Sequence, residues 1–154
     1  MEKAFRPMIL DIVRQATKLK DAYTSEESAP VNYACIFAQS QAEYDEFVKS
    51  ASDIGKIIDN TSSGPLFRID PLDTVSGKLQ LLKVRMPDAT RPERGDADFT
   101  VSDYPTFKRK YLAKQGFKLI KKENFEMIEL MDPYSFNVRA YFSNPPLDKQ
   151  LNIT

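Results

Sequence analysis

Carboxylates alternate with apolar residues in the stretch 94–107, RGDADFTVSDYPTF. A strand has a side-chain period of two, so it would place two acids and a threonine on one face and three apolar residues on the other: Asp96, Asp98 and Thr100 against Ala97, Phe99 and Val101. The uninterrupted apolar face is expected to pack on the core. The two aspartates then point the other way, where they are either solvated or line a site. In a site we expect both to be ionised and paired with cationic side chains.

The residue types present limit the chemistry that these acids could support. The chain has no histidine, which excludes a Ser-His-Asp or Cys-His nucleophile, a histidine general base and a zinc site of ordinary composition. Its single cysteine, Cys35, lies in an apolar run and is expected to be a buried, inert thiol rather than a nucleophile. Any catalysis must therefore use carboxylates, Lys, Arg, Tyr or a cofactor, and no cofactor is expected.

A second candidate acid lies in the stretch 125–132, FEMIELMD. Glu129 shares a face with Phe125 and Met127, so burial of that face would raise its pKa and make it a candidate general base. The opposite face carries Ile128 and Leu130. Both faces are apolar enough to be the core, and the interpretation we favour places Ile128 and Leu130 in the core and leaves Glu129 in solvent.

Bulk composition narrows the class of partner. The 154 residues carry 22 Lys and Arg and 22 Asp and Glu, so the formal net charge is zero and neither nucleic acid nor a membrane surface is an expected partner. The longest apolar runs are only a few residues long, which predicts no membrane span, no signal peptide and a cytoplasmic location. The length suits one well-packed domain.

The elements that must position these residues follow one order twice. An amphipathic helix is predicted at the start of the chain, over residues 1–24, and a polar linker, TSEESAP, follows at 24–30. A strand at 31–38, a helix at 40–54 and three strands up to 87 come next, with Ser40 and Glu43 forming a capping box. After a Pro-, Arg- and Asp-rich connector at 86–96, which is expected to close over a cleft or contact a second subunit, the same order of strand, helix and three strands returns at 95–146.

Registration supports an internal repeat. A shift of 63 residues superposes Tyr33 on Asp96, a shift of 61 superposes Gly55 on Gly116, and a shift of 58 superposes Pro87 on Pro145. The small drift is what loops of unequal length produce. The residues 147–154 are left as a tail.

Two βαβββ modules in a chain of this size resemble the vicinal oxygen chelate superfamily, the glyoxalase and extradiol-dioxygenase fold. The stretch that most resembles it is DADFTVSDYPTFKRKYLAKQGFKLI (residues 96–120), and the resemblance spans about 31–146. It implies an α+β domain of two βαβββ modules, 31–87 and 95–146, forming curved mixed sheets around a cleft. At the family's metal positions this chain has Tyr33 and Asp96 on the first strands and no carboxylate on the last, so we expect no metal site and regard the chain as a divergent member.

In such a scaffold the inward-facing polar residues would meet a ligand. The candidate ligand-binding residues come from both modules: Tyr33, Lys83, Asp98, Arg139 and Tyr141. Lys83 and Arg139 suit an anionic small molecule, and the tyrosines suit a flat or apolar body with a hydroxyl group to orient. Alternatively, Lys83 and the aspartates pair across the sheet and fill a cleft that binds nothing.

Two functions of different class remain open. The first is a small-molecule-binding protein on a glyoxalase-like scaffold without the usual histidine ligands. The second is an isomerase, a lyase or another enzyme of the superfamily that uses Glu129 or Asp96 as a base on a small oxo- or hydroxy-acid, with a hard cation on carboxylates as an open question. A homodimer is also predicted, because the first helix lies outside the repeated unit and must cover apolar surface somewhere.

Overall fold

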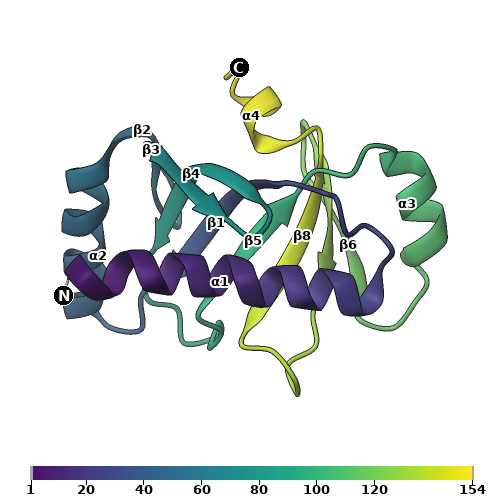
Figure 1. Cartoon of the computed structure of the whole chain (residues 1–154), viewed down its shortest axis with the longest axis horizontal. Coiled ribbons are helices and arrows are strands. Elements are labelled where there is room, and N and C mark those ends of the chain that lie inside the picture. The colour runs from purple at the N-terminus through teal and green to yellow at the C-terminus, as the bar shows by residue number, and fades with distance from the viewer. Residues whose placement is uncertain (1, 154) are drawn as a thin grey trace.

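The structure, a computed structural model, describes residues 2–153. Within this range the chain forms one eight-stranded mixed sheet with three helices packed around it and a short helix near the C-terminus (Figure 1). The first module comprises β1 (Val31–Phe37), α2 (Gln41–Ile54), β2 (Gly55–Thr61), β3 (Gly64–Thr74) and β4 (Gly77–Arg85). The second comprises β5 (Gly95–Phe99), α3 (Tyr104–Tyr111), β6 (Phe117–Lys121), β7 (Glu126–Leu130) and β8 (Val138–Asn144). The two βαβββ modules are thus as predicted, and they share one sheet rather than forming two.

The sheet order β2-β3-β4-β1-β5-β8-β7-β6 reveals the internal two-fold. In each module the first strand pairs in parallel with the last, and the two first strands pair antiparallel at the centre. Tyr33 lies opposite Asp98, Cys35 lies opposite Asp96, and Ala34 and Ala97 pair between them. The reciprocal pairing makes Tyr33 and Asp96 equivalent, which confirms the registration read from the sequence.

The helix α1 (Glu2–Tyr23) covers one face of the sheet and crosses the junction between the modules (Figure 1). It contacts β1, β5 and β8. Its apolar stripe is buried in its own chain, with Ile9, Val13, Ala16 and Leu19 fully inaccessible. The apolar face of β5 lies on this side, because Ala97 and Phe99 are also fully buried in the same core. The predicted in-and-out orientation of β5 is therefore correct.

Local signals in the sequence set the ends of the two module helices. Ser40 caps α2 by accepting a hydrogen bond from the Glu43 backbone N–H at 3.1 Å, and Asp103 caps α3 by accepting one from Thr106 at 3.2 Å. The α2 and α3 helices lie at opposite ends of α1 (Figure 1). Among residues 2–153, no helix is both long and apolar enough to cross a membrane.

A fourth helix, α4 (Leu147–Gln150), forms within the segment expected to be a tail. Its position is fixed by a reciprocal side-chain contact, since Asn32 donates to the Asp148 carboxylate at 2.8 Å and accepts from the Asp148 backbone N–H at 3.1 Å. The face of the sheet opposite α1 is thereby partly covered, at the end of β1 where the chain enters that strand.

Candidate functional site

Polar side chains gather on the sheet face opposite α1 because strand alternation sends every second residue there. Cys35 on β1 lies between Lys83 on β4 and Asp96 on β5, since it pairs with both. One step along the strands, Tyr33, Asp98, Tyr141 and Glu129 form the next row across β1, β5, β8 and β7. The site therefore draws on both modules and straddles their junction.

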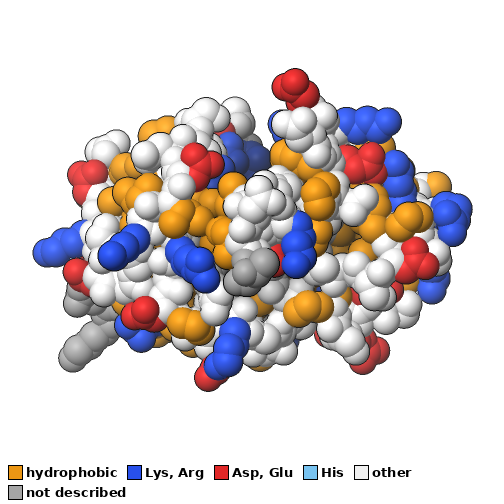
Figure 2. All heavy atoms as spheres, turned by 90° about the horizontal axis from the view of Figure 1, so that it is seen from above, with side chains coloured by type: hydrophobic (Ala, Val, Ile, Leu, Met, Phe, Trp, Pro, Cys, Tyr) orange, Lys and Arg blue, Asp and Glu red, His pale blue; other side chains and the backbone are white. Residues whose placement is uncertain are grey.

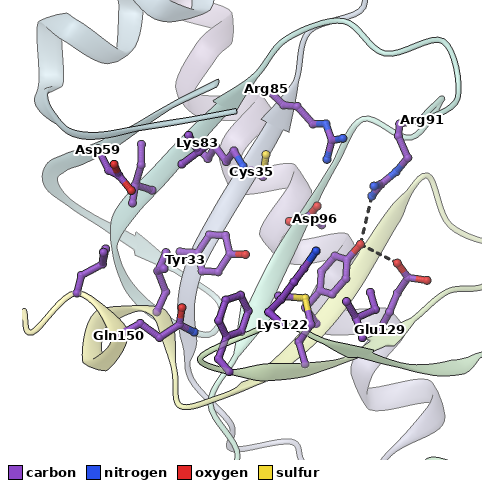
Figure 3. A pocket seen from close by; sticks show the side chains of 18 residues that line it. Tyr33, Cys35, Asp59, Lys83, Arg85, Arg91, Asp96, Lys122, Glu129 and Gln150 are labelled. Carbon is purple, nitrogen blue, oxygen red and sulfur yellow. Dashed lines mark hydrogen bonds between the residues drawn. The ribbon is translucent and has the colours of Figure 1, made fainter. Parts of the chain in front are cut away.

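A cavity of about 430 Å³ opens on this face (Figure 3). Its charged and polar lining consists of Tyr33, Cys35, Asp59, Thr61, Lys83, Arg85, Arg91, Asp96, Lys122, Glu129, Tyr141 and Gln150. Its apolar lining consists of Leu66, Ile120, Phe125, Met127, Leu147 and Leu151. Figure 2 views the molecule from the side on which α4 lies and shows hydrophobic side chains on this face with Lys and Arg side chains around them. A volume of this size accommodates a small organic molecule.

One wall of the cavity is a closed ring of five side chains. Arg91 donates to Glu93 at 2.8 Å and to the Tyr141 hydroxyl at 3.2 Å. Tyr141 donates to Glu129 at 2.8 Å, and Arg139 joins the two acids, to Glu129 at 3.0 Å and Glu93 at 2.9 Å. Figure 3 shows the part of this ring that faces the cavity.

The ring is electrically balanced, with two guanidinium groups on two carboxylates. Glu93 and Glu129 are each only 7% exposed, so the charged hydrogen bonds replace the water that burial removes. Burial, and then the charges of Asp96 and Glu129, raise the pKa of Tyr141 well above its ordinary value, so its hydroxyl keeps its proton. The bonded ring thus presents the Tyr141 hydroxyl and the Arg91 guanidinium to the cavity.

Asp96 stands beside this ring without joining it. Its side chain is 6% exposed and lines the cavity, yet no hydrogen bond or ion pair reaches its carboxyl group from residues 2–153. Burial raises the pKa of Asp96 to about 7; Asp98 and Glu93 reinforce the shift, and Arg91 and Lys83 oppose it. The carboxyl group can therefore either donate or accept a proton at neutral pH.

Two further polar groups converge on the same space. The Lys83 ammonium and the Tyr33 hydroxyl also have no hydrogen-bond or ion-pair partner within the described part of the chain, and Figure 3 shows both directed into the cavity. Burial, followed by the charges of Asp98 and Asp96, raises the pKa of Tyr33 well above its ordinary value. The Cys35 thiol, between Lys83 and Asp96, is 3% exposed, and burial also raises its pKa well above the ordinary value, which leaves it protonated and a poor nucleophile.

The structure brings five of the seven predicted site residues to the cavity: Tyr33, Lys83, Asp96, Glu129 and Tyr141. Asp98 is fully buried outside the cavity lining, where it accepts hydrogen bonds from the Ser143 hydroxyl and backbone N–H. Arg139 lies behind the wall, held by Glu93 and Glu129. Both residues support the site from outside the cavity lining.

Two sequence interpretations are corrected here. Glu129 is not solvated: Ile128 and Leu130 do occupy the core, but β7 has its other face against the cavity, where Arg139 and Tyr141 hold the Glu129 carboxylate. Neither Asp96 nor Asp98 forms an ion pair with Lys83 or Arg139 within the described residues. Burial raises the pKa of both Asp96 and Asp98 to about 7, and no described cation bonds to either.

Several cavity residues escaped the sequence reasoning. Arg91 comes from the connector between modules, which has no periodicity to predict its direction, and Cys35 was assigned to the core because its neighbours are apolar. Leu147 and Leu151 belong to the segment beyond the second module. The one available signal was parity, because Cys35 lies two residues after Tyr33 and must share its face.

The residues at the metal positions implied by the family resemblance do not fit a metal ion. Those positions hold Tyr33, Asp96, Lys83 and Tyr141, which together supply one carboxylate, two protonated phenols and an ammonium group. No group of three or more metal-ligating acids or thiols occurs within residues 2–153.

Fold and cavity together define an α+β protein of paired βαβββ modules with a polar cleft across their junction. No protein-family model and no curated protein sequence matches the chain. A solved structure titled "Structural Genomics, Protein EC4020" is similar at 9% identity, with a TM-score of 0.70 over 92% of this chain and 86% of that one. A glyoxalase/bleomycin resistance protein/dioxygenase superfamily member from Vibrio splendidus 12B01 aligns at 10% identity, with a TM-score of 0.40 over 75% of this chain and 97% of that one. At such identities the first likeness shows the fold alone.

Proposed function

We propose that this protein binds a small carboxylate-bearing molecule in the cleft between its two modules, as a divergent member of the vicinal oxygen chelate superfamily. The observation that carries the proposal is the Asp96 carboxyl group, 6% exposed, facing a cavity and without a described partner. A carboxyl group with so little access to water is stabilised by a ligand that donates a hydrogen bond to it.

Charge in the cavity favours an anion. Lys83 and Lys122 carry no ion pair within the described residues, and Arg85 has only a 3.3 Å contact with Asp88. On the acidic side, Glu129 is neutralised by Arg139, Asp96 is only partly ionised at neutral pH, and Asp59 supplies one exposed carboxylate against the cations Lys83, Lys122 and Arg85. A carboxylate entering the cavity therefore meets a net positive field.

The test begins with the ligand itself. Protein purified under native conditions should release a small acid on denaturation, identified by mass spectrometry. Its affinity, measured by calorimetry, should fall at least about tenfold in Lys83→Met, the loss of one charge-assisted hydrogen bond. Lys78→Met is the matched control, because that lysine is 66% exposed on the β3–β4 hairpin, away from the cavity. An unchanged affinity in Lys83→Met would contradict the proposal.

An enzymatic function is the second candidate, and one observation favours it. A carboxyl group with a pKa of about 7, within a cavity and beside the Tyr33 hydroxyl and Lys83 ammonium, is suited to move a proton next to a carbonyl group, whose oxygen the other two would stabilise. The geometry supports Asp96 in this role over Glu129, whose carboxylate already holds Arg139 and Tyr141.

Exchange of the proton next to the carbonyl group tests the second candidate. Incubation of a 2-oxo acid such as 4-methyl-2-oxopentanoate in D₂O should produce deuteration at C3 faster than in buffer alone, followed by NMR. Asp96→Asn should abolish the acceleration, whereas Asp70→Asn, at an exposed residue outside the cavity lining, should retain it. Equal exchange with and without protein would exclude this reaction.

A further inference from the structure

Lys83 and Asp96 face the same cavity but are held apart. Each pairs with Cys35, from opposite sides of β1, so their backbones are two strand spacings apart, on the order of 10 Å. No ion pair joins them, although both lack other partners within the described residues. The small thiol between them leaves the space above β1 open. A ligand group that fills this space meets a cation on one side and a carboxyl group on the other.

We propose that the ligand is a 2-amino acid with an apolar side chain, its carboxylate on Lys83 and its ammonium group on Asp96. This inference rests on the proposed function and names the ligand class of the same cavity. A zwitterionic head carries an ammonium group and a carboxylate on opposite sides of one carbon atom, so it can face an acid on one side and a cation on the other, as the arrangement of Asp96 and Lys83 requires.

The surroundings of Asp96 favour an ammonium group over a hydroxyl group as its partner. The carboxyl group receives no donor from the described chain, and an ammonium group supplies a charged donor, which makes roughly twice as strong a hydrogen bond as a neutral one. The Tyr33 hydroxyl can accept a second ammonium hydrogen. Lys83, supported by Arg85, remains for the ligand carboxylate.

The apolar part of the ligand has a defined place. Met127 lies on β7 two residues before Glu129, on the same face of the sheet. Across the strands it is therefore one row from Tyr33 and Tyr141, and two rows from Lys83 and Asp96. Phe125 precedes that strand, and Leu147 and Leu151 line the cavity from the C-terminal segment. The cavity therefore changes from charged to apolar along one direction, as a head and a hydrocarbon side chain require.

A matched series of ligands tests the head group. L-Leucine, 2-hydroxy-4-methylpentanoate and 4-methylpentanoate share one side chain and carboxylate and differ only in the group at C2; L-phenylalanine, 3-phenyllactate and 3-phenylpropionate form a second series. Calorimetry on the full chain should show the amino acid binding at least about tenfold more tightly than the plain acid in at least one series. Asp96→Asn should bring the amino acid to the level of the plain acid, whose affinity serves as the folding control. Lys83→Met should weaken all three.

The number of protons released or taken up when the ligand binds provides a test of the head group that is independent of affinity. Several titratable or charged groups surround Asp96 on β1, β4, β5, β8 and the connector: Tyr33, Cys35, Lys83, Asp98, Arg139, Tyr141, Arg91 and Glu93. Among these, Asp96 and Asp98 have a pKa near 7, and Asp98 is bonded to Ser143 outside the cavity lining. An ammonium group beside Asp96 should release its proton at pH 7, whereas a plain carboxylate should cause proton uptake. Calorimetry in two buffers of different ionisation enthalpy distinguishes the two signs.

The outcomes separate this inference from the proposed function. Plain acids that bind as tightly as the amino acids would overturn the inference and leave carboxylate binding supported. A co-purified ligand that lacks an amino group would do the same. If no compound of either series binds and no small acid is released from the purified protein, both proposals are wrong.

Discussion

The most informative single residue is Asp96, a carboxyl group in the cavity lining whose pKa burial raises toward neutrality. A carboxyl group whose folded-state pKa is raised from 3.8 to about 7 favours the native state in its protonated form. Its contribution to stability is therefore full below about pH 4 and is lost as the pH rises through 7.

We expect Asp96→Asn to remove part of this pH dependence. The variant should be as stable as the parent at pH 4 and more stable at pH 8, by on the order of 2–4 kcal/mol, because the amide cannot acquire the buried charge. Urea unfolding at a series of pH values measures the difference. The pKa of Asp98 is raised in the same direction, so Asp98 should account for the pH dependence of stability that remains in the variant. Asp59→Asn, at an exposed position, is the control, and an unaltered pH profile in Asp96→Asn would contradict the assignment.

The ring of side chains makes a second residue-scale prediction. Glu93→Gln removes one of its two carboxylates and leaves Arg91 and Arg139 with a single acid between them. Breaking a buried pair in this way should cost about 2–4 kcal/mol in the free energy of unfolding. Asp73→Asn breaks an ion pair to Lys78 in which both side chains are well exposed, and should cost less than about 1 kcal/mol. Equal losses in the two variants would show that the ring is not a structural unit.

The alternation of side chains along a strand explains which parts of the site could be predicted from the sequence, because it fixes the face on which each residue lies. Parity alone placed Tyr33 and Asp96 on one side of their strands, and the repeat brought Lys83 and Tyr141 to the same face. The ionisation state of Asp96 could not be predicted in this way, because its pKa depends on burial by elements that are distant in the sequence. Arg91 was not identified individually for a similar reason: its side chain is directed by Glu93 and Tyr141, not by a regular element.

At the scale of elements, most strands and helices were predictable because each carries its own local signal, such as Ser40 before α2 and Gly116 before β6. The exception is α4, whose four residues are too few for a periodic pattern and whose place depends on Asn32, over a hundred residues earlier. Its Leu147 and Gln150 side chains line the cavity. The element with the weakest local signal thus forms one boundary of the site.

Asn32→Ala should loosen α4 without unfolding the domain. Loss of the two hydrogen bonds to Asp148 should speed hydrogen exchange at Leu151, Asn152 and Ile153, whose N–H groups bond within this segment. The change in global stability should stay within about 1–2 kcal/mol. Exchange followed by mass spectrometry measures both, with Asn60→Ala on the edge strand β2 as the control. Unchanged exchange at these three amides would show that Asn32 does not position α4.

At the scale of the whole molecule, the homodimer stays a prediction, but its reason has changed. The α1 helix was expected to need a partner surface, and instead it buries its apolar stripe on its own sheet. The remaining support is the edge strand β2, where Ile57 and Ile58 are 46% and 42% exposed. Sedimentation at micromolar concentration should reveal a species of twice 17.6 kDa that Ile57→Lys dissociates. A single species of 17.6 kDa would reject the dimer.

The same helix packs against strands of both modules, so we expect it to couple their folding. Ile12 on α1 is 1% exposed and lies against Gly95, where a side-chain Cβ would come within 2.8 Å of it and within 2.3 Å of the Cys35 carbonyl oxygen. This contact is at the seam between β1 and β5, directly behind Cys35 and the cavity. A side chain lost at this point should weaken both modules together.

Ile12→Ala should therefore lower the free energy of unfolding by about 2–4 kcal/mol, as a buried large-to-small change does. Leu10→Ala, two residues earlier on the same helix, is the matched control, because that side chain is 37% exposed and should cost less than about 1 kcal/mol. Urea unfolding followed by circular dichroism and by tyrosine fluorescence should give one coincident transition in both variants. Two separated transitions in Ile12→Ala would mean that the modules fold independently and that α1 covers them without coupling them.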